Sequence, residues 1–259
     1  MSDNNPPRLR HVEHCMGTVF SFDVRGARDP RVRAALDEAV AGLHRVDAVF
    51  STFRADSEIS RLGRGELALA QCSAEVREVL GLCEEAERRT DGWFTPRYAG
   101  PGTALDPTGL VKGWAVERAA RTIAAAGAGK VCLNGGGDVQ LTGGPWRVGI
   151  ADPLRPGGLA TVVEADGELA VATSGPAERG CHILDPRTGE PPAGRLASLT
   201  VVCPALTEAD TWATAGYAMG GRAREWLEGL PDVEAFAVAP DGTTWHTSGF
   251  GRFVAKLSA

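Results

Sequence analysis

The spacing of apolar residues changes near Gly127, and this change restricts the fold more than any other feature of the sequence. Before it, apolar residues recur every three or four positions over about 30–50, 73–91 and 110–126, which is typical of amphipathic helices. After it, short apolar strands are divided by Gly-rich turns. These strands are residues 131–134, 138–143, 146–150, 160–165, 169–174 and 199–203. Helices in one half of the chain and strands in the other predict an α+β fold.

The two ends of the chain extend this pattern. Residues 1–10 are polar and Pro-rich and are expected to form a disordered lead-in. Residues 11–24 alternate in polarity and are expected to form one strand. The remaining expected elements are a short helix at 57–62, helices at about 208–219 and 221–229, and a closing hairpin at 235–247. Because no linker or repeat is visible, residues 11–259 are predicted to form one two-lobed domain, with mixed sheets flanked by helices.

Composition excludes several classes of function. The net charge is −6, whereas nucleic-acid binding normally requires a basic surface, so no nucleic-acid partner is expected. No run of 18 apolar residues is present, so no membrane insertion is expected. The first residues lack the apolar stretch of a signal peptide, which favours a cytoplasmic location. The six cysteines form no CxxC pair or zinc spacing and are expected to be free thiols.

Two Gly-containing segments have both a binding and a structural interpretation. In Asp106-Pro-Thr-Gly109-Leu-Val-Lys112-Gly113, a helix start offers backbone N–H groups to an anion, and Lys112 adds positive charge. From spacing alone, the favoured alternative is an ordinary helix start capped by Asp106 or Thr108. Residues 134–138, Asn-Gly-Gly-Gly-Asp, are typical of a hairpin turn, although three glycines also suggest close approach by a ligand.

Thr173-Ser174-Gly175 ends a predicted strand, and His182 follows eight residues after Ser174. A lone histidine is more often structural than catalytic. Residues 185–189, Asp-Pro-Arg-Thr-Gly, are typical of a turn in any protein.

Asp210 and Thr214 are the most informative pair. They lie four residues apart, so they share one face of the predicted helix. A carboxylate beside a hydroxyl suits a hard divalent cation such as Mg²⁺. Alternatively, Thr207 caps the helix and Asp210 completes a variant capping box, which leaves Thr214 without a role. Spacing alone does not decide between the two.

Taken together and in order, eight segments resemble the FAD:protein FMN transferase (ApbE) family over roughly 200 residues. They are MGTVFSF (16–22), FSTFRADSEISRL (50–62), DPTGLVKGWAVE (106–117), LNGGGDV (133–139), GPWRVGIADP (144–153), VATSG (171–175), HILDPRTGEP (182–191) and LTVVCPALTEADTWATAGYAMG (199–220).

The resemblance implies an α+β fold with an FAD cleft and Mg²⁺ at the diphosphate. The residues implied to contact FAD are Met16, Phe53, Asp106, Lys112, Thr173, Ser174, His182 and Ile183. The backbone oxygen of Gly109, with Asp210 and Thr214, would hold the metal, and this favours the metal interpretation of the Asp210–Thr214 pair. His182 would accept the proton, and Lys112 would stabilise the departing charge.

The implied activity is Mg²⁺-dependent transfer of FMN from FAD to a Ser or Thr hydroxyl of an acceptor protein, with release of AMP. The alternatives are an FAD diphosphatase, which uses water as the acceptor, and an FAD-binding protein without turnover. The chain departs from the family in three places. Phe53 replaces a usual Tyr, the segment from Phe94 to Asp106 is short, and so is PAERGC (176–181). The acceptor is expected to be a cytoplasmic protein or a cytoplasmic domain of a membrane protein.

Overall fold

Two sheets carry all ten strands within the residues that the computed structural model describes, which are 7–27, 29–97, 105–176, 183–192 and 196–255. The strands are β1 (Arg8–Cys15), β2 (Thr18–Arg25), β3 (Lys130–Gly135), β4 (Asp138–Thr142), β5 (Trp146–Ala151), β6 (Leu159–Ala165), β7 (Leu169–Ser174), β8 (Ser198–Cys203), β9 (Glu234–Val238) and β10 (Thr244–His246). The large sheet has the order β1-β2-β3-β4-β7-β8-β9-β10, and β5 pairs with β6 alone.

The α+β class is confirmed, but the expected mixed sheets are wrong, because every strand pair formed by the described residues is antiparallel. A single-helix crossover would join parallel strands. Here each connection in the large sheet instead starts the next strand at the end of the sheet where the previous strand finished, so neighbouring strands run antiparallel. Between β8 and β9, for example, two helices in succession make the connection.

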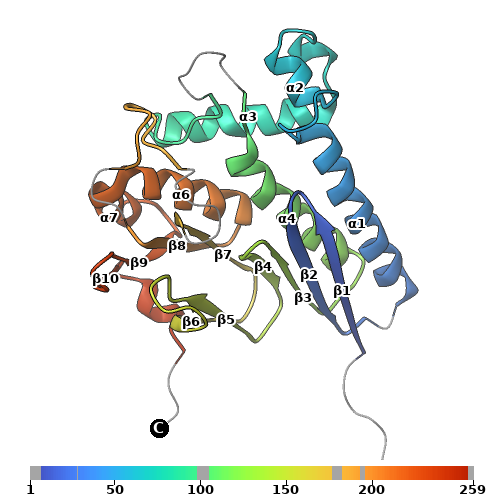
Figure 1. Ribbon diagram of the computed structural model, residues 1–259. Helices are drawn as coiled ribbons and strands as arrows, with labels where there is room; N and C mark the ends of the chain where they lie inside the picture. The colour runs from blue at the N-terminus through green and yellow to red at the C-terminus, as the bar shows by residue number, and fades with distance from the viewer. Residues whose placement is uncertain (1–6, 28, 98–104, 177–182, 193–195, 256–259) are drawn as a thin grey trace, which may run out of the picture.

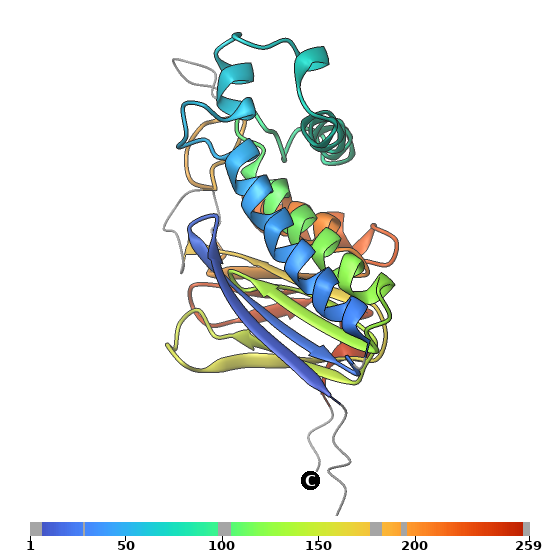
Figure 2. The ribbon, with the colours of Figure 1, turned by 90° about the vertical axis from the view of Figure 1, so that its right-hand side faces the viewer.

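Helices cover one face of the large sheet (Figure 1). The helices that contact this face are α1 (Pro30–Phe50), α4 (Thr108–Ala125), α6 (Leu206–Met219) and α7 (Ala223–Glu228), with η2 (Gly220–Arg222) between the last two. Between α1 and α4 the chain forms α2 (Glu58–Gly63), η1 (Leu69–Gln71) and α3 (Ala74–Arg89), and η3 (Phe250–Phe253) packs on the opposite face. Figure 2 shows α1 and α4 side by side above the strands. Because α4 also packs against α6, it is the central helix of this layer. The predicted starts of α2 and α3 are confirmed, since Ser57 and Ser73 cap them through their side chains.

The large sheet has apolar side chains on both faces, so two core layers form. On β8, Leu199 and Val201 pack toward the helices. Val202 belongs to the second layer, which lies beneath the β5–β6 hairpin and η3. Successive side chains of a strand point to opposite faces, which separates the two sets. The candidate site forms between these layers, at one end of the inner strands of the sheet.

The N-terminal segment differs from its prediction in two ways. The expected strand over 11–24 is a hairpin, because Met16 and Gly17 form a two-residue turn with φ of 51° and 67°. Because Cys15 pairs with Thr18 across the turn, the inward-facing positions change from odd numbers in β1 to even numbers in β2. Residues 8–10, expected in the disordered lead-in, form the first part of β1.

Two further expectations concern the thiols and the membrane. The five cysteines at described positions are free, as predicted (Cys15, Cys72, Cys83, Cys132 and Cys203). Cys181 lies outside the described residues. Within the described part of the chain, no helix is both long and apolar enough to cross a bilayer.

Candidate active site

A cavity of about 900 Å³ lies at one end of the inner strands of the large sheet. Its walls come from the start of α4, the middle of α6, the β1–β2 turn and the neighbouring ends of β4, β7 and β8. Every predicted site residue that the structure describes lines it: Met16, Phe53, Asp106, Gly109, Lys112, Thr173, Ser174, Ile183, Asp210 and Thr214. His182 lies outside the described residues. The fold therefore gathers at one cavity residues that are almost 200 positions apart.

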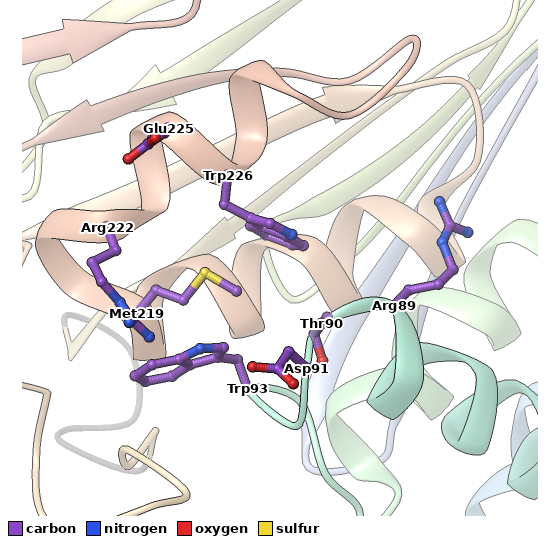
Figure 3. Close-up of a pocket in the computed structure, with 8 residues that line it drawn as sticks. All are labelled: Arg89, Thr90, Asp91, Trp93, Met219, Arg222, Glu225 and Trp226. Atoms are coloured by element: carbon purple, nitrogen blue, oxygen red, sulfur yellow. The ribbon is translucent and has the colours of Figure 1, made fainter.

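A smaller cavity of about 340 Å³ lies between the end of α3 and the α6–α7 region. Figure 3 shows Trp93 beside Met219, with Arg222 and Trp226 nearby. The guanidinium of Arg222 lies 4.7 Å from the centre of the Trp93 ring. None of the described site residues lines this smaller cavity, so the predicted site corresponds to the larger cavity.

Asp210 joins two helices. It is 5% exposed, and its Oδ2 accepts a hydrogen bond of 3.1 Å from the backbone N–H of Gly113 in α4. The capping-box alternative is wrong, because α6 begins one residue before Thr207 and Ala205 precedes it as the cap. Thr207 instead donates from its N–H and hydroxyl to Glu117, at 2.8 and 2.7 Å. With no role at the helix start, the Asp210 carboxylate and the Thr214 side chain remain together at the cavity wall.

Gly113 allows this contact between α4 and α6. A Cβ atom at position 113 would lie 2.7 Å from the carbonyl oxygen of Leu206 and 2.9 Å from the Cβ of Asp210. Real Cβ atoms are almost never so close to other atoms. The sequence did not reveal this role of Gly113, although an isolated glycine inside a helical pattern often has a packing reason.

Lys112 lies between two buried carboxylates. Its ammonium contacts the carboxylate of Asp138 and lies 3.8 Å from Oδ2 of Asp210. Asp138 is 1% exposed, and its Oδ1 accepts a hydrogen bond of 2.9 Å from the N–H of Thr173. Asp138 therefore connects α4 with the end of β7 and fixes the position of Lys112. Asp138 was not among the predicted site residues, although it ends the glycine-rich segment 134–138 that the sequence indicated.

The glycine-containing segments form the helix start and the hairpin turn that the spacing favoured, and they also line the cavity. The expected cap at Asp106 or Thr108 is wrong, because Pro107 is the cap residue and Thr108 is the first residue of α4. Asp106 accepts a hydrogen bond of 2.9 Å from the N–H of Thr108, which satisfies one of the free amides at the start of α4. Residues 134–138 form the β3–β4 turn, in which Asn134 accepts from the N–H of Gly137 at 3.0 Å. Asp106, Thr108, Asn134 and Gly137 line the cavity, so a structural role does not exclude contact with a ligand.

Aromatic and apolar groups are placed very differently around the cavity. Phe53 is 99% exposed at the rim, whereas Ile183 is 8% exposed. Met16 reaches the cavity from the β1–β2 turn with a positive φ, which is uncommon for a residue with a side chain. The predicted turn at 185–189 is confirmed, because the N–H of Gly189 donates to the carbonyl of Asp185 at 2.8 Å.

The sequence model of the ApbE family matches residues 16–101 and 96–237, which together include most of the chain and all the site residues named above. The chain belongs to the ApbE family.

Relatives and solved structures agree with this ApbE assignment. The FAD:protein FMN transferase of Salmonella typhimurium is 27% identical over 171 residues, which cover 60% of this chain and 49% of the relative. The chain thus matches about half the length of such relatives. The ApbE protein of Thermotoga maritima has a TM-score of 0.85 at 21% identity, covering 96% of this chain and all of the other. The apo flavinyl transferase ApbE of Pseudomonas stutzeri has a TM-score of 0.82 at 22% identity, covering 98% of this chain and all of the other. At these identities the structures establish the ApbE fold.

Proposed function

We propose that this chain transfers the FMN half of FAD to a Ser or Thr hydroxyl of an acceptor protein, with Mg²⁺, and releases AMP. The observation that carries the proposal is the meeting of Gly109, Lys112, Asp210 and Thr214 on one wall of a cavity of about 900 Å³. The Salmonella typhimurium relative bears the name of this activity.

The oxygen donors at this wall suit Mg²⁺. The carboxylate of Asp210, the hydroxyl of Thr214 and the backbone carbonyl of Gly109 are hard ligands. Among the described residues, no three His, Cys, Asp or Glu side chains form a group that could hold a metal. A protein site with a single carboxylate fits Mg²⁺, which usually binds one or two carboxylates and completes its shell with water and substrate phosphates. When bound, Mg²⁺ would act as a Lewis acid toward the diphosphate.

The chain's own residues have separate roles in this proposal. Lys112, held by Asp138, offers positive charge to the diphosphate, and Thr108 and Gly109 in the first turn of α4 line the same cavity, where a helix start favours an anion. The acceptor oxygen forms a bond to the phosphorus on the FMN side while the bond from that phosphorus to the AMP oxygen breaks. His182 takes the proton of the acceptor hydroxyl, a role suited to imidazole near neutral pH. Met16 and Phe53 provide contacts to a ring of FAD. A cytoplasmic location stays a prediction from the sequence.

Incubation with FAD, Mg²⁺ and a lysate of the source organism tests the proposal. A fluorescent flavin band that persists on a denaturing gel would support transfer. Release of FMN and AMP without a band would identify an FAD diphosphatase instead. Intact bound FAD with neither product would identify a binding protein without turnover.

The variant Asp210→Ala tests whether Asp210 is a ligand of the proposed metal. It should abolish Mg²⁺-dependent cleavage of FAD while circular dichroism shows the helices retained, because the carboxylate supplies the charged ligand. Asp37→Ala is a matched control, since that carboxylate lies on the exposed surface of α1 and its side chain is 66% accessible. Full activity of Asp210→Ala would remove Asp210 from the proposed metal site.

A further inference from the structure

A buried hydroxyl in the large cavity has no hydrogen-bond partner within the described structure. Ser198, the first residue of β8, is 4% exposed and lines the cavity, and its Oγ is unbonded. Two residues further along the same face of β8, the hydroxyl of Thr200 lies 2.9 Å from the hydroxyl of Thr173. A buried polar atom without a partner is unfavourable, so native proteins rarely keep one without a reason.

A glycine follows the end of β7 beside Ser198. A Cβ atom at Gly175 would lie 2.8 Å from the carbonyl oxygen of Ala197 and 3.6 Å from the Cβ of Ser198. Glycine therefore lets β7 and β8 stay adjacent, and it places no side chain beside Ser198. The Thr-Ser-Gly motif thus shapes the cavity through its glycine as well as through its hydroxyl groups.

The same part of the cavity has apolar walls. Val139 and Val171 oppose each other on β4 and β7, and Ile150 belongs to the β5–β6 hairpin that covers this face of the sheet. All three line the cavity and are at most 4% exposed. Apolar walls with one hydrogen-bonding group are typical of sites for flat heteroaromatic rings.

We propose that Ser198 is a specificity-determining residue whose Oγ hydrogen-bonds the polar edge of a heteroaromatic ring of the dinucleotide. The inference rests on the proposed function. A hydroxyl both donates and accepts, so it can pair with a ring nitrogen, a ring carbonyl or an amino group. Both ring systems of FAD carry such groups, and the experiment distinguishes them.

Ser198→Ala should weaken FAD binding about three- to tenfold, which corresponds to the loss of one hydrogen bond. Fluorescence titration of the full chain in Mg²⁺ measures this. In the absence of FAD, the melting temperature should stay the same or rise, because the substitution removes an unbonded polar atom. Thr200→Val is the matched control. It removes a neighbouring buried hydroxyl that is bonded to Thr173, so it should lower the melting temperature.

Riboflavin and AMP then identify the ring. Weaker binding of riboflavin alone would place Ser198 at the flavin edge, and weaker binding of AMP alone would place it at the adenine edge. Equal affinity of wild-type and Ser198→Ala for FAD would overturn the inference while leaving the proposed function intact. Failure of the wild-type chain to bind FAD would instead refute the proposed function.

Discussion

Replacing Gly113 with alanine would place a methyl group between α4 and α6, beside the carboxylate of Asp210. The new Cβ would lie 2.7 Å from the carbonyl oxygen of Leu206, where ordinary contact begins at 3.4 Å. A backbone carbonyl cannot rotate away as a side chain can. The two helices must therefore separate by several tenths of an ångström, and Asp210 moves with α6.

The expected magnitude follows from two opposing contributions. Overpacking of this kind costs about 1–3 kcal/mol, whereas alanine gains about 1 kcal/mol over glycine inside a helix. Because the obstacle is backbone, we expect a net loss of about 1–2 kcal/mol. For a chain of this size, this lowers the melting temperature by roughly 2–8 °C. Displacement of Asp210 should also reduce the rate of Mg²⁺-dependent FAD cleavage about 10- to 100-fold.

Gly81→Ala provides the matched control, because Gly81 lies within α3 and nothing is within 4 Å of the Cβ position. The same substitution there should stabilise the chain by about 0.5–1 kcal/mol. Thermal unfolding and FAD cleavage at saturating Mg²⁺ measure both variants. If Gly113→Ala is as stable as Gly81→Ala and turns over at the wild-type rate, the assigned packing role of Gly113 is wrong.

Two further predictions concern charged groups. In Asp138→Asn, Lys112 loses a carboxylate partner and is drawn toward Asp210, 3.8 Å away. The Mg²⁺ concentration for half-maximal FAD cleavage should then rise roughly tenfold, as a competing interaction of about 1.4 kcal/mol requires; an unchanged Mg²⁺ titration would contradict this. Burial opposes ionisation of Asp23, but hydrogen bonds from Arg8 and Arg25 outweigh it and lower the pKa of its carboxyl. Its stabilising contribution is therefore present above the unfolded pKa of about 3.9 and is lost as the pH falls through the folded value. Asp23→Asn should lower the melting temperature more at pH 7 than at pH 3, and an equal effect at both would refute the ion-pair role.

Local patterns determined most of the secondary structure. The helix over 30–50 and the caps at Ser57 and Ser73 follow from side chains within a few positions of one another, and such short-range features are visible in the sequence. The turn at Met16 shifts the inward positions from odd to even numbers, but the hairpin was missed because polar His11 and Glu13 occupy inward positions of β1 and hide the shift. The order of motifs along the chain was sufficient to indicate the family and the residues that line the cavity.

Tertiary structure alone decided how the site residues are held. The hydrogen bond between Asp210 and Gly113 joins residues 97 positions apart, and the ion pair between Lys112 and Asp138 joins residues 26 apart. The hydroxyl of Ser198 likewise lacks a hydrogen-bond partner because of how the end of β7 and the start of β8 lie beside each other in the sheet. Such contacts depend on the packing of whole elements against each other, and a periodic pattern within one element carries no information about its neighbours.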